Sequence, residues 1–370
     1  MDLRNIYQET LRHFLRPIQP LLDDPAVTEV LINGHDSVYC ERGGQLSRTD
    51  VTFASAELLM VAVRNLAEYV NRPIGDVHHS MDARLPDGSR VHVIVPPCSR
   101  GGVHVSIRKF KKASFSLQSL VEWGSINEEA AEFLRLAVQL HKNTIIAGGT
   151  GTGKTSFLNA LSTAINPAER VVVIEDSSEL QLQQPHVVYL ESCPPRPDGR
   201  GEVTIRDLFV DALRMRPDRV VVGEVRRGEA LDMIQSMISG HSGAMATVHA
   251  TTPRDALIRL ETLCMMAGID IPAHVARVQV ASAVHLVLQL TRLDDGSRRV
   301  ASISEIRGLN ANGDFVAADL YVFQARGRDE QGRILGELEP TDAIPSFADE
   351  PYKMGLGDAV QLTARKFPRP

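Results

Sequence analysis

The amino-acid sequence predicts an α/β protein, in which a domain built on a parallel sheet follows a smaller α+β domain. Short strands and helices alternate between residues 117 and 308, and this alternation is typical of a parallel sheet with helices on both faces. A glycine-rich loop joins one of these strands to a helix, whereas strands and turns dominate the region before residue 110. With 370 residues, the chain is long enough for roughly two or three domains.

The smaller domain is expected over residues 1–110. Residues 27–32 form an apolar, β-branched run that ends at Asn33-Gly34, a pair that favours a turn. Residues 55–69 repeat apolar side chains at the spacing of one helix face. Further strands are expected at 38–42, in a hairpin over 83–95, and at 103–107. Together these elements predict a small sheet accompanied by one helix.

The larger domain is expected over residues 117–308, after a polar linker at 111–116. Its strands are predicted at 143–147, 171–174, 220–222 and 245–248. Beyond residue 308 the pattern weakens, because Asn-Gly and isolated glycines interrupt short pieces of chain. Residues 309–370 are therefore predicted to form a C-terminal extension that packs on the larger domain or trails it.

Composition and charge exclude some classes of function. The net charge is −6 and aromatic residues make up 5% of the chain, which argues against a basic, aromatic surface for nucleic acid. The start lacks the apolar core of a signal peptide, no apolar run could span a bilayer, and the four cysteines are far apart. A cytoplasmic protein with no specific nucleic-acid partner is expected. A local cluster of arginines fits a phosphate or subunit contact: Arg214, Arg216, Arg219, Arg226 and Arg227.

The glycine-rich loop satisfies the phosphate-loop pattern in full. Its residues are Gly148, Gly149, Thr150, Gly151, Thr152, Gly153, Lys154 and Thr155, followed by Ser156. The glycines let main-chain N–H groups wrap phosphate oxygens, and the helix start adds the positive end of its dipole. Lys154 is expected to contact the β- and γ-phosphates and the Thr155 hydroxyl to bind Mg²⁺. A glycine turn without a ligand is the alternative, and the strand–loop–helix context argues against it.

Two carboxylates at predicted strand ends are candidates for the chemistry of phosphoryl transfer. Glu175 follows the strand at 171–174, and Glu224 follows the strand at 220–222. Functional groups of open α/β sheets lie at the carboxyl ends of strands, so both are expected beside the phosphate loop. Either carboxylate could instead be a helix cap or a solvated side chain. Two of them downstream of a phosphate loop favour a function, and Glu224 is the better candidate to hold the metal.

His241 and His249 flank the predicted strand at 245–248. A histidine near a nucleotide can hydrogen-bond phosphate or relay the state of the γ-phosphate to a moving element. A purely structural role fits the spacing about equally well. Neither pair has the spacing of a zinc protease, so a histidine metal site is not expected.

Taken together, these segments resemble the ATPases that serve type II secretion, type IV pili and type IV secretion. Residues 173–180 resemble the Asp box of that superfamily, residues 214–226 its Walker B segment, and residues 240–250 its His box. Residues 82–90 and 106–110 resemble amino-terminal stretches whose arginines face the γ-phosphate. The likeness covers nearly the whole chain.

Within the superfamily, the sequence is most similar to the CpaF/TadA ATPases of Tad (Flp) pili. Residues 179–187 and the tail segments 319–323 and 332–336 are typical of that branch. The type II secretion and pilus assembly ATPases usually carry a tetracysteine subdomain, which the four scattered cysteines exclude here. One departure from the family is Val248, where threonine is frequent before the histidine.

The resemblance implies a RecA-like ATPase domain preceded by a PAS-like domain, in a homohexamer that binds ATP and Mg²⁺ between the two domains and at the subunit boundary. It implies that Glu175 polarises water and that Glu224 holds the metal or its water shell. Positive charge would come from Arg90, Arg108 and Arg84, and from Arg216 of a neighbouring subunit. Inner-membrane platform proteins would be the partners, and they would hold the cytoplasmic motor at the membrane.

Three alternatives remain open at this stage. The first is a VirB11-like or conjugative ATPase that exports protein or DNA by type IV secretion, and the tail beyond residue 308 favours the Tad branch over it. The second is a non-hydrolysing nucleotide-binding regulator, although Lys154, Glu175 and Glu224 are all present. The third is a RecA-like helicase, which the charge and the few aromatic residues disfavour.

Overall fold

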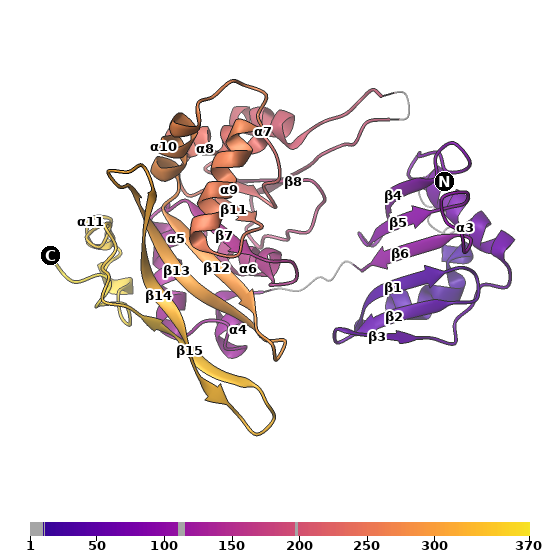
Figure 1. The fold of residues 1–370 in the computed structure, drawn as a ribbon, viewed down its shortest axis with the longest axis horizontal. Coiled ribbons are helices and arrows are strands. Elements are labelled where there is room, and N and C mark those ends of the chain that lie inside the picture. Colours follow the sequence, from indigo (N-terminus) through magenta and orange to yellow (C-terminus); the bar gives the residue numbers. More distant parts are fainter. Residues whose placement is uncertain (1–9, 11, 110–114, 197–198) are drawn as a thin grey trace. The chain divides into compact units, whose positions relative to one another are not determined.

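The computed structural model describes residue 10 and residues 12–109, 115–196 and 199–370. The chain separates into two compact units, one made of Met1–Ala113 with Arg196–Arg200 and the other of Ser114–Pro195 with Gly201–Pro370. Most of the linker expected at 111–116 lies outside the described residues. The domain boundaries stay a prediction, and each unit is described below by itself (Figure 1).

The first unit contains one antiparallel sheet in the order β3-β2-β1-β6-β5-β4. Its elements are η1 (Arg16–Ile18), α2 (Gln19–Asp23), β1 (Val27–Asn33), β2 (Val38–Arg42), β3 (Gln45–Arg48), α3 (Ala56–Tyr69), β4 (Ser80–Arg84), β5 (Arg90–Ile94) and β6 (His104–Arg108). The Ser55 side chain caps α3 by accepting from the Leu58 N–H. The apolar face of α3, with Leu59 and Leu66, joins one core with the sheet residues Ile32 and Ile107.

Three arginines lie in one row of that sheet. Arg84 at the end of β4 pairs with Arg90 at the start of β5, and Arg90 pairs with Arg108 at the end of β6. Directly paired residues of neighbouring strands point to the same face of a sheet. The three arginines that the sequence singled out therefore share one face and one end of the sheet.

The second unit is built on a nine-stranded sheet in the order β15-β14-β13-β12-β7-β11-β10-β8-β9. Its strands are β7 (Thr144–Gly148), β8 (Val171–Glu175), β9 (Val187–Glu191), β10 (Arg219–Val222), β11 (Met245–Val248), β12 (Leu286–Arg292), β13 (Arg298–Leu309), β14 (Phe315–Arg328) and β15 (Ile334–Pro340). The run from β12 to β9 is parallel, whereas β13, β14 and β15 join it antiparallel. The predicted α/β fold with a parallel sheet is confirmed.

Helices cover both faces of this sheet. They are α4 (Leu117–Glu122), α5 (Glu128–Gln139), α6 (Lys154–Ser162), α7 (Ile205–Arg214), α8 (Glu229–Ile238), α9 (Pro253–Met265), α10 (Ala273–Ala283), the short α11 (Glu350–Lys353) and η2 (Gly357–Ala359). Alternate residues of β8 enter different cores, because Val173 packs with α5 and α6 while Val172 packs with α7 and α8. This alternation is why all five residues of β8 are buried.

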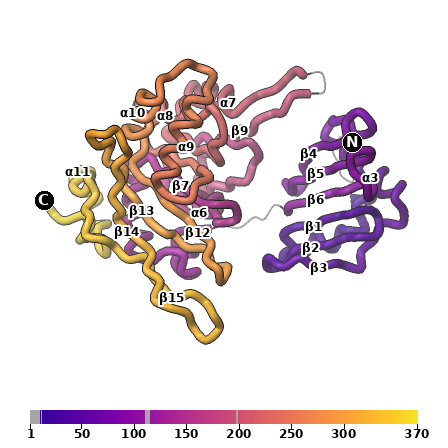
Figure 2. The backbone as a smooth tube through the Cα atoms, in the orientation of Figure 1, coloured from indigo at the N-terminus to yellow at the C-terminus, as the bar shows by residue number. Residues whose placement is uncertain are grey.

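Residues beyond 308 continue the sheet. β13 ends at Leu309, and β14 and β15 then form a long hairpin paired to its edge (Figure 2). The tail after β15 packs on α5, where Phe133 stacks against Phe367 with ring centroids 5.5 Å apart. Within the described residues, no helix has both the length and the apolar character needed to cross a membrane.

Candidate active site

The phosphate loop (residues 148–155) connects the buried strand β7 to helix α6. Gly151 and Gly153 have positive φ angles of 73° and 93°, which only glycine adopts at little cost. A Cβ atom on Gly148 would lie 2.5 Å from Thr152 Oγ1 and 3.0 Å from the carbonyl oxygen of Leu290. No side chain caps the start of α6 at Gly153. The loop therefore presents main-chain N–H groups at a helix start, as phosphate binding requires.

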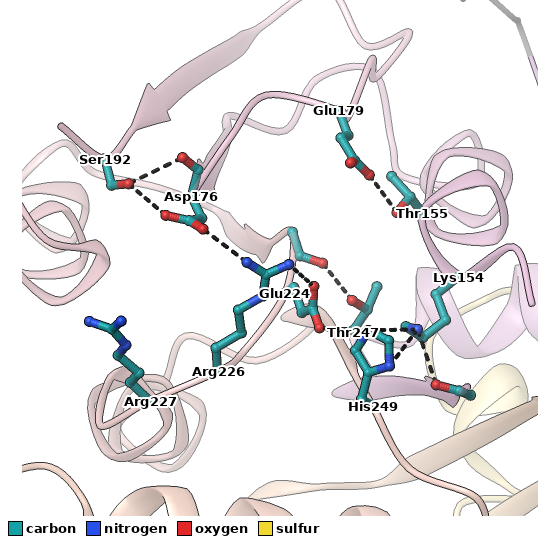
Figure 3. Close-up of polar contacts among 12 residues, drawn as sticks. Lys154, Thr155, Asp176, Glu179, Ser192, Glu224, Arg226, Arg227, Thr247 and His249 are labelled. Carbon is teal, nitrogen blue, oxygen red and sulfur yellow. Dashed lines mark hydrogen bonds and ion pairs between the residues drawn. The ribbon is translucent and has the colours of Figure 1, made fainter. Parts of the chain in front are cut away.

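Lys154 lies folded back over its own loop. Its Nζ atom donates to the carbonyl oxygens of Gly148 and Gly149, each at 3.0 Å, and the residue is 8% exposed. Nζ also lies 3.3 Å and 3.5 Å from Nε2 and Nδ1 of His249 (Figure 3). Burial lowers the pKa of Lys154, and the nearby Glu224 carboxylate acts in the opposite direction. Lys154 thus lies against the main chain of the loop, and the lysine of such loops contacts phosphate oxygens.

Thr155 faces a carboxylate that the sequence analysis did not single out. The Thr155 hydroxyl donates to Oε2 of Glu179 at 3.0 Å (Figure 3). Glu179 belongs to the segment that leaves β8, where Glu175 holds the main chain in place. Oε1 of Glu175 accepts from the N–H groups of Glu179 and Leu180 at 2.8 and 2.9 Å. Glu175 therefore holds the main chain that follows β8, and this main chain brings the Glu179 carboxylate to Thr155 at the start of α6.

Glu175 itself is 4% exposed and lies against the neighbouring strand. A Cβ atom on Gly223, at the end of β10, would lie 2.8 Å from Cγ of Glu175. Glycine at position 223 therefore leaves the space that the Glu175 side chain fills. The main chain of Gly223 is held in turn by Thr247, whose hydroxyl donates to its carbonyl oxygen at 2.6 Å.

Glu224 lies in a network of charges between β10 and β11. Its Oε2 accepts from Nη2 of Arg226 at 2.7 Å, and its Oε1 lies 2.9 Å from Nε2 of His249. Nη1 of the same arginine donates to Asp176 at 3.0 Å, so Arg226 bridges the ends of β8 and β10 (Figure 3). The hydrogen bond to Glu224 is the largest cause of the raised pKa of Arg226.

His249 is the histidine that joins this cluster. Burial, followed by the charge of Lys154, lowers its pKa below the usual 6.5, although Glu224 acts against this. A neutral His249 can donate from Nε2 to Glu224 and accept at Nδ1 from Lys154. The histidine thereby links the lysine of the phosphate loop to the carboxylate after β10.

Two other predicted site residues lie elsewhere in this unit. His241 precedes β11 and Arg216 precedes β10, so both are at the amino ends of parallel strands, opposite the phosphate loop. Within the described residues, the buried Nδ1 of His241 has no hydrogen-bond partner. Arg216 is exposed and adopts a positive φ of 54°. Neither side chain joins the phosphate loop of its own chain.

The arginine cluster expected around residues 214–227 is not one surface, and the expectation of a single contact is wrong. Arg219 is fully buried, because its guanidinium pairs with Glu169 and donates to the carbonyl oxygens of Val138 and Gly243 at 2.7 and 3.2 Å. Arg226 lies at the other end of β10, in the network with Glu224. Strand β10 separates the two arginines along the sheet.

Sequence reasoning missed the contacts of Glu179, Asp176, Arg226 and Arg298. Arg298, at the start of β13, donates from Nε to the Gly151 carbonyl oxygen at 2.9 Å across 147 positions of sequence. No local pattern marks such a long-range contact. Glu179 and Asp176 follow Glu175 so closely that the carboxylates clustered after this strand were a usable signal for both.

The residues beside the phosphate loop fit a nucleotide that binds together with a metal ion. Within the described part of the chain, no group of three or more His, Cys, Asp or Glu side chains is arranged to hold a metal ion. Magnesium in nucleotide sites is bound by only one or two protein oxygens, together with phosphates and water. The Thr155 hydroxyl and the carboxylates of Glu179 and Glu224 supply oxygens of that kind beside the phosphate loop.

Comparison with known proteins agrees with this fold and loop. The profile of the type II/IV secretion system protein family matches residues 13–335. A Mycobacterium tuberculosis protein named for conjugal transfer is 36% identical over 327 residues, which span 87% of this chain and 92% of that protein. The type IV secretion system protein VirB11 of Brucella suis is 31% identical over 320 residues, or 79% of this chain and 88% of that protein.

A solved structure shares the fold at lower identity. The Legionella pneumophila ATPase DotB superposes with a TM-score of 0.56 and 17% identity, covering 78% of this chain and 79% of that one. The likeness at this identity concerns the fold alone. The family match and the two relatives carry the assignment. The chain therefore belongs to the type II/IV secretion system protein family, and it is an ATPase of the secretion and pilus kind.

Proposed function

We propose that this ATPase hydrolyses Mg-ATP at its phosphate loop to drive assembly, or assembly and retraction, of a Tad or type IV-like pilus or a related secretion machine. One observation carries the chemical part of the proposal. The phosphate loop after β7 and the carboxylates after β8 and β10 lie at the same edge of one parallel sheet. That arrangement brings a phosphate-binding loop together with groups that can orient water and a metal.

The residues of the loop are proposed to bind the phosphates. Lys154 would exchange the carbonyl oxygens of Gly148 and Gly149 for the β- and γ-phosphate oxygens, which carry more negative charge. Thr155 and Glu224 are the candidates to hold magnesium or its waters. Magnesium bound with the nucleotide supplies positive charge that stabilises phosphoryl transfer. The first turn of α6, with Ser156, would contact the remaining phosphate.

Glu175 is proposed to polarise the attacking water, and His249 to report on the γ-phosphate through Glu224. The support for His249 is its contact with both Lys154 and Glu224. Glu175 has the support of its place at the carboxyl end of β8 and of the space that Gly223 leaves for it. Among the residues that the structure describes, His241 makes no comparable contact, so a role at a nucleotide would have to involve a neighbouring subunit.

We propose further that the working form is a homohexamer and that arginines complete each site. Arg84, Arg90 and Arg108 form one row in the amino-terminal unit and would present positive charge to the γ-phosphate. Arg216 would reach the nucleotide of a neighbouring subunit. Mixing Arg216→Ala with Lys154→Ala subunits tests the trans contact, because mixed rings regain some hydrolysis only if the two residues act across a boundary.

The direct test of the chemistry separates binding from hydrolysis. Glu175→Gln should retain ADP affinity and lose hydrolysis by about 100-fold or more, because a positioned acid–base group contributes roughly 10²–10⁴. Steady-state phosphate release and ADP titration on the same preparation measure the two quantities. Near-normal hydrolysis by Glu175→Gln would show that Glu175 does not polarise the attacking water. A wild-type protein that binds ATP without hydrolysing it would favour the alternative of a non-hydrolysing nucleotide-binding regulator.

Type IV secretion is the second candidate for the driven process. It is favoured by the relatives named for conjugal transfer and for VirB11. The Tad assignment rests on the likeness of residues 179–187 and of the tail. Deleting the gene in its host separates the two: loss of surface pili supports the Tad pilus, whereas intact pili with failed transfer of protein or DNA support the secretion channel. In either process, inner-membrane platform proteins are the proposed partners and would hold the motor at the membrane.

A further inference from the structure

We propose that Glu179 is a magnesium-positioning residue, which orients the Thr155 hydroxyl toward the metal of the bound nucleotide. The inference rests on the proposed function, since it assigns a task within the same site. Glu179 lies outside the phosphate loop and after the end of β8. Its Oε2 atom accepts a hydrogen bond from the Thr155 hydroxyl, and the two oxygens are 3.0 Å apart.

The hydrogen bond from the Thr155 hydroxyl to Glu179 is of the kind that a metal-binding hydroxyl requires. A threonine hydroxyl has one proton to donate and two lone pairs to offer. When it binds a metal through a lone pair, its proton needs a separate acceptor. Groups that accept from a ligating side chain fix its orientation and tune the metal site. The Glu179 carboxylate is such an acceptor, and it leaves the lone pairs of Thr155 Oγ1 to the metal.

The position of Glu179 is itself fixed by the main chain. Its N–H donates to Oε1 of the buried Glu175 at 2.8 Å, and the next N–H, of Leu180, donates to the same oxygen at 2.9 Å. Leu180 is 2% exposed and belongs to the core that contains α6. The segment that carries Glu179 is therefore anchored on both sides, and its carboxylate can hold one geometry against α6.

Charge places Glu179 beside the phosphate site as well. Its charge acts through space against the burial that lowers the pKa of Lys154, and it adds to the hydrogen bond to Glu224 that raises the pKa of Arg226. The other nearby carboxylate, Glu224, is already engaged by Arg226 at 2.7 Å and by His249 at 2.9 Å. Of these two carboxylates, Glu179 is the one in direct contact with Thr155.

The test is the magnesium dependence of ADP binding to the full-length protein. Glu179→Ala removes the acceptor, so it should bind ADP as the wild type does in EDTA, yet need about 10-fold more magnesium for the metal-dependent gain in affinity, because such outer contacts contribute roughly 10–100-fold. Glu179→Asp should recover part of the loss because it keeps the charge. Glu191→Ala is the matched control, since Glu191 pairs with Glu175 and ends β9 at the same sheet edge.

Folding should survive these changes, because residue 179 is anchored through its main-chain N–H, and thermal unfolding checks this directly. A double-mutant cycle with Thr155→Val adds a second readout: if Glu179 acts through the Thr155 hydroxyl, the double variant should be no worse than Thr155→Val alone. A magnesium midpoint of Glu179→Ala within about twofold of the wild type overturns the inference alone. A wild-type protein that binds no nucleotide overturns the inference and the proposed function together.

Discussion

Lys154 and His249 form a side-chain contact that the sequence did not predict. From the sequence, Lys154 is a phosphate ligand and His249 is one of two histidines beside a strand. In the structure their nitrogens are 3.3 Å apart, and Glu224 lies on the other side of the histidine. A cation beside a partly buried imidazole disfavours a second positive charge.

This contact predicts a pH dependence for His249. Its folded-state pKa lies below 6.5, so near pH 6 the unfolded chain binds more protons than the folded one at this position. The free energy of unfolding should therefore rise with pH through the region below 6.5 and level off above it. Urea unfolding near pH 5.5 and pH 7.5 should show a smaller loss on acidification for His249→Gln than for the wild type.

His141 provides a useful control for that experiment, since it also contacts a carboxylate, Glu169 at 3.4 Å, but lies away from Lys154. His141→Gln should leave the acid sensitivity caused by His249 in place. Equal losses of stability on acidification for His249→Gln and the wild type would contradict the lowered pKa of His249, which burial and then the charge of Lys154 cause.

Sequence alone could predict the loop and the carboxylates after strands, because each depends on a local pattern. Glu175 is the last residue of β8 and Glu224 comes shortly after β10, so both lie at the strand ends where they were expected. It did not separate His249 from His241, although the rule that placed the carboxylates applies to them too: in a parallel sheet the residue after β11 lies at the edge of the loop and the residue before β11 does not. The sequence also suggests a surface position for Arg219, because its partners Val138, Glu169 and Gly243 are far from it in sequence.

At the scale of elements, the C-terminal tail is the part that sequence patterns described least. β14 and β15 extend the sheet, and the chain then returns to α5. Glu132 of α5 is 7% exposed and accepts from the N–H groups of Gln361, Leu362 and Thr363 and from the Thr363 hydroxyl. Burial acts to raise the pKa of Glu132, but these hydrogen bonds outweigh it and the pKa is lowered. The carboxylate thus serves as the attachment point of the tail.

Replacing that carboxylate should destabilise the ATPase unit. Glu132→Ala leaves three main-chain N–H groups without their acceptor in a buried site, which should reduce the free energy of unfolding by about 3 kcal/mol. The only tryptophan of the chain, Trp123, belongs to this unit and follows α4. Its fluorescence during urea unfolding measures the change.

Glu128→Ala is the matched control, because Glu128 lies one turn earlier in α5 and contacts only the exposed Gln118 at 3.2 Å among the hydrogen bonds found for its side chain. Its effect should be within about 0.5 kcal/mol, as is usual for surface substitutions. A loss for Glu132→Ala no larger than that of Glu128→Ala would show that the tail is not attached through this carboxylate.

At the scale of the whole molecule, one unit carries the phosphate loop and the carboxylates of the proposed ATPase site, and the other carries a row of arginines. The sequence pattern and the sheet order agree on the parallel core, where β7, β8, β10 and β11 are buried along their whole length. The antiparallel hairpin and the tail were less predictable, because their stability comes from contacts far apart in sequence, such as Phe133 with Phe367.

The central claim is that hydrolysis of ATP takes place at the phosphate loop, and phosphate release by the purified full-length protein in magnesium tests it most directly. The wild type should hydrolyse ATP, and Lys154→Ala should lose about 100-fold or more of the rate, because removing one donor to developing phosphate charge costs roughly that much. Lys353→Ala, which removes an exposed lysine paired with Asp349, should keep the wild-type rate. Equal rates for Lys154→Ala and the wild type, or no hydrolysis by the wild type, would contradict the account.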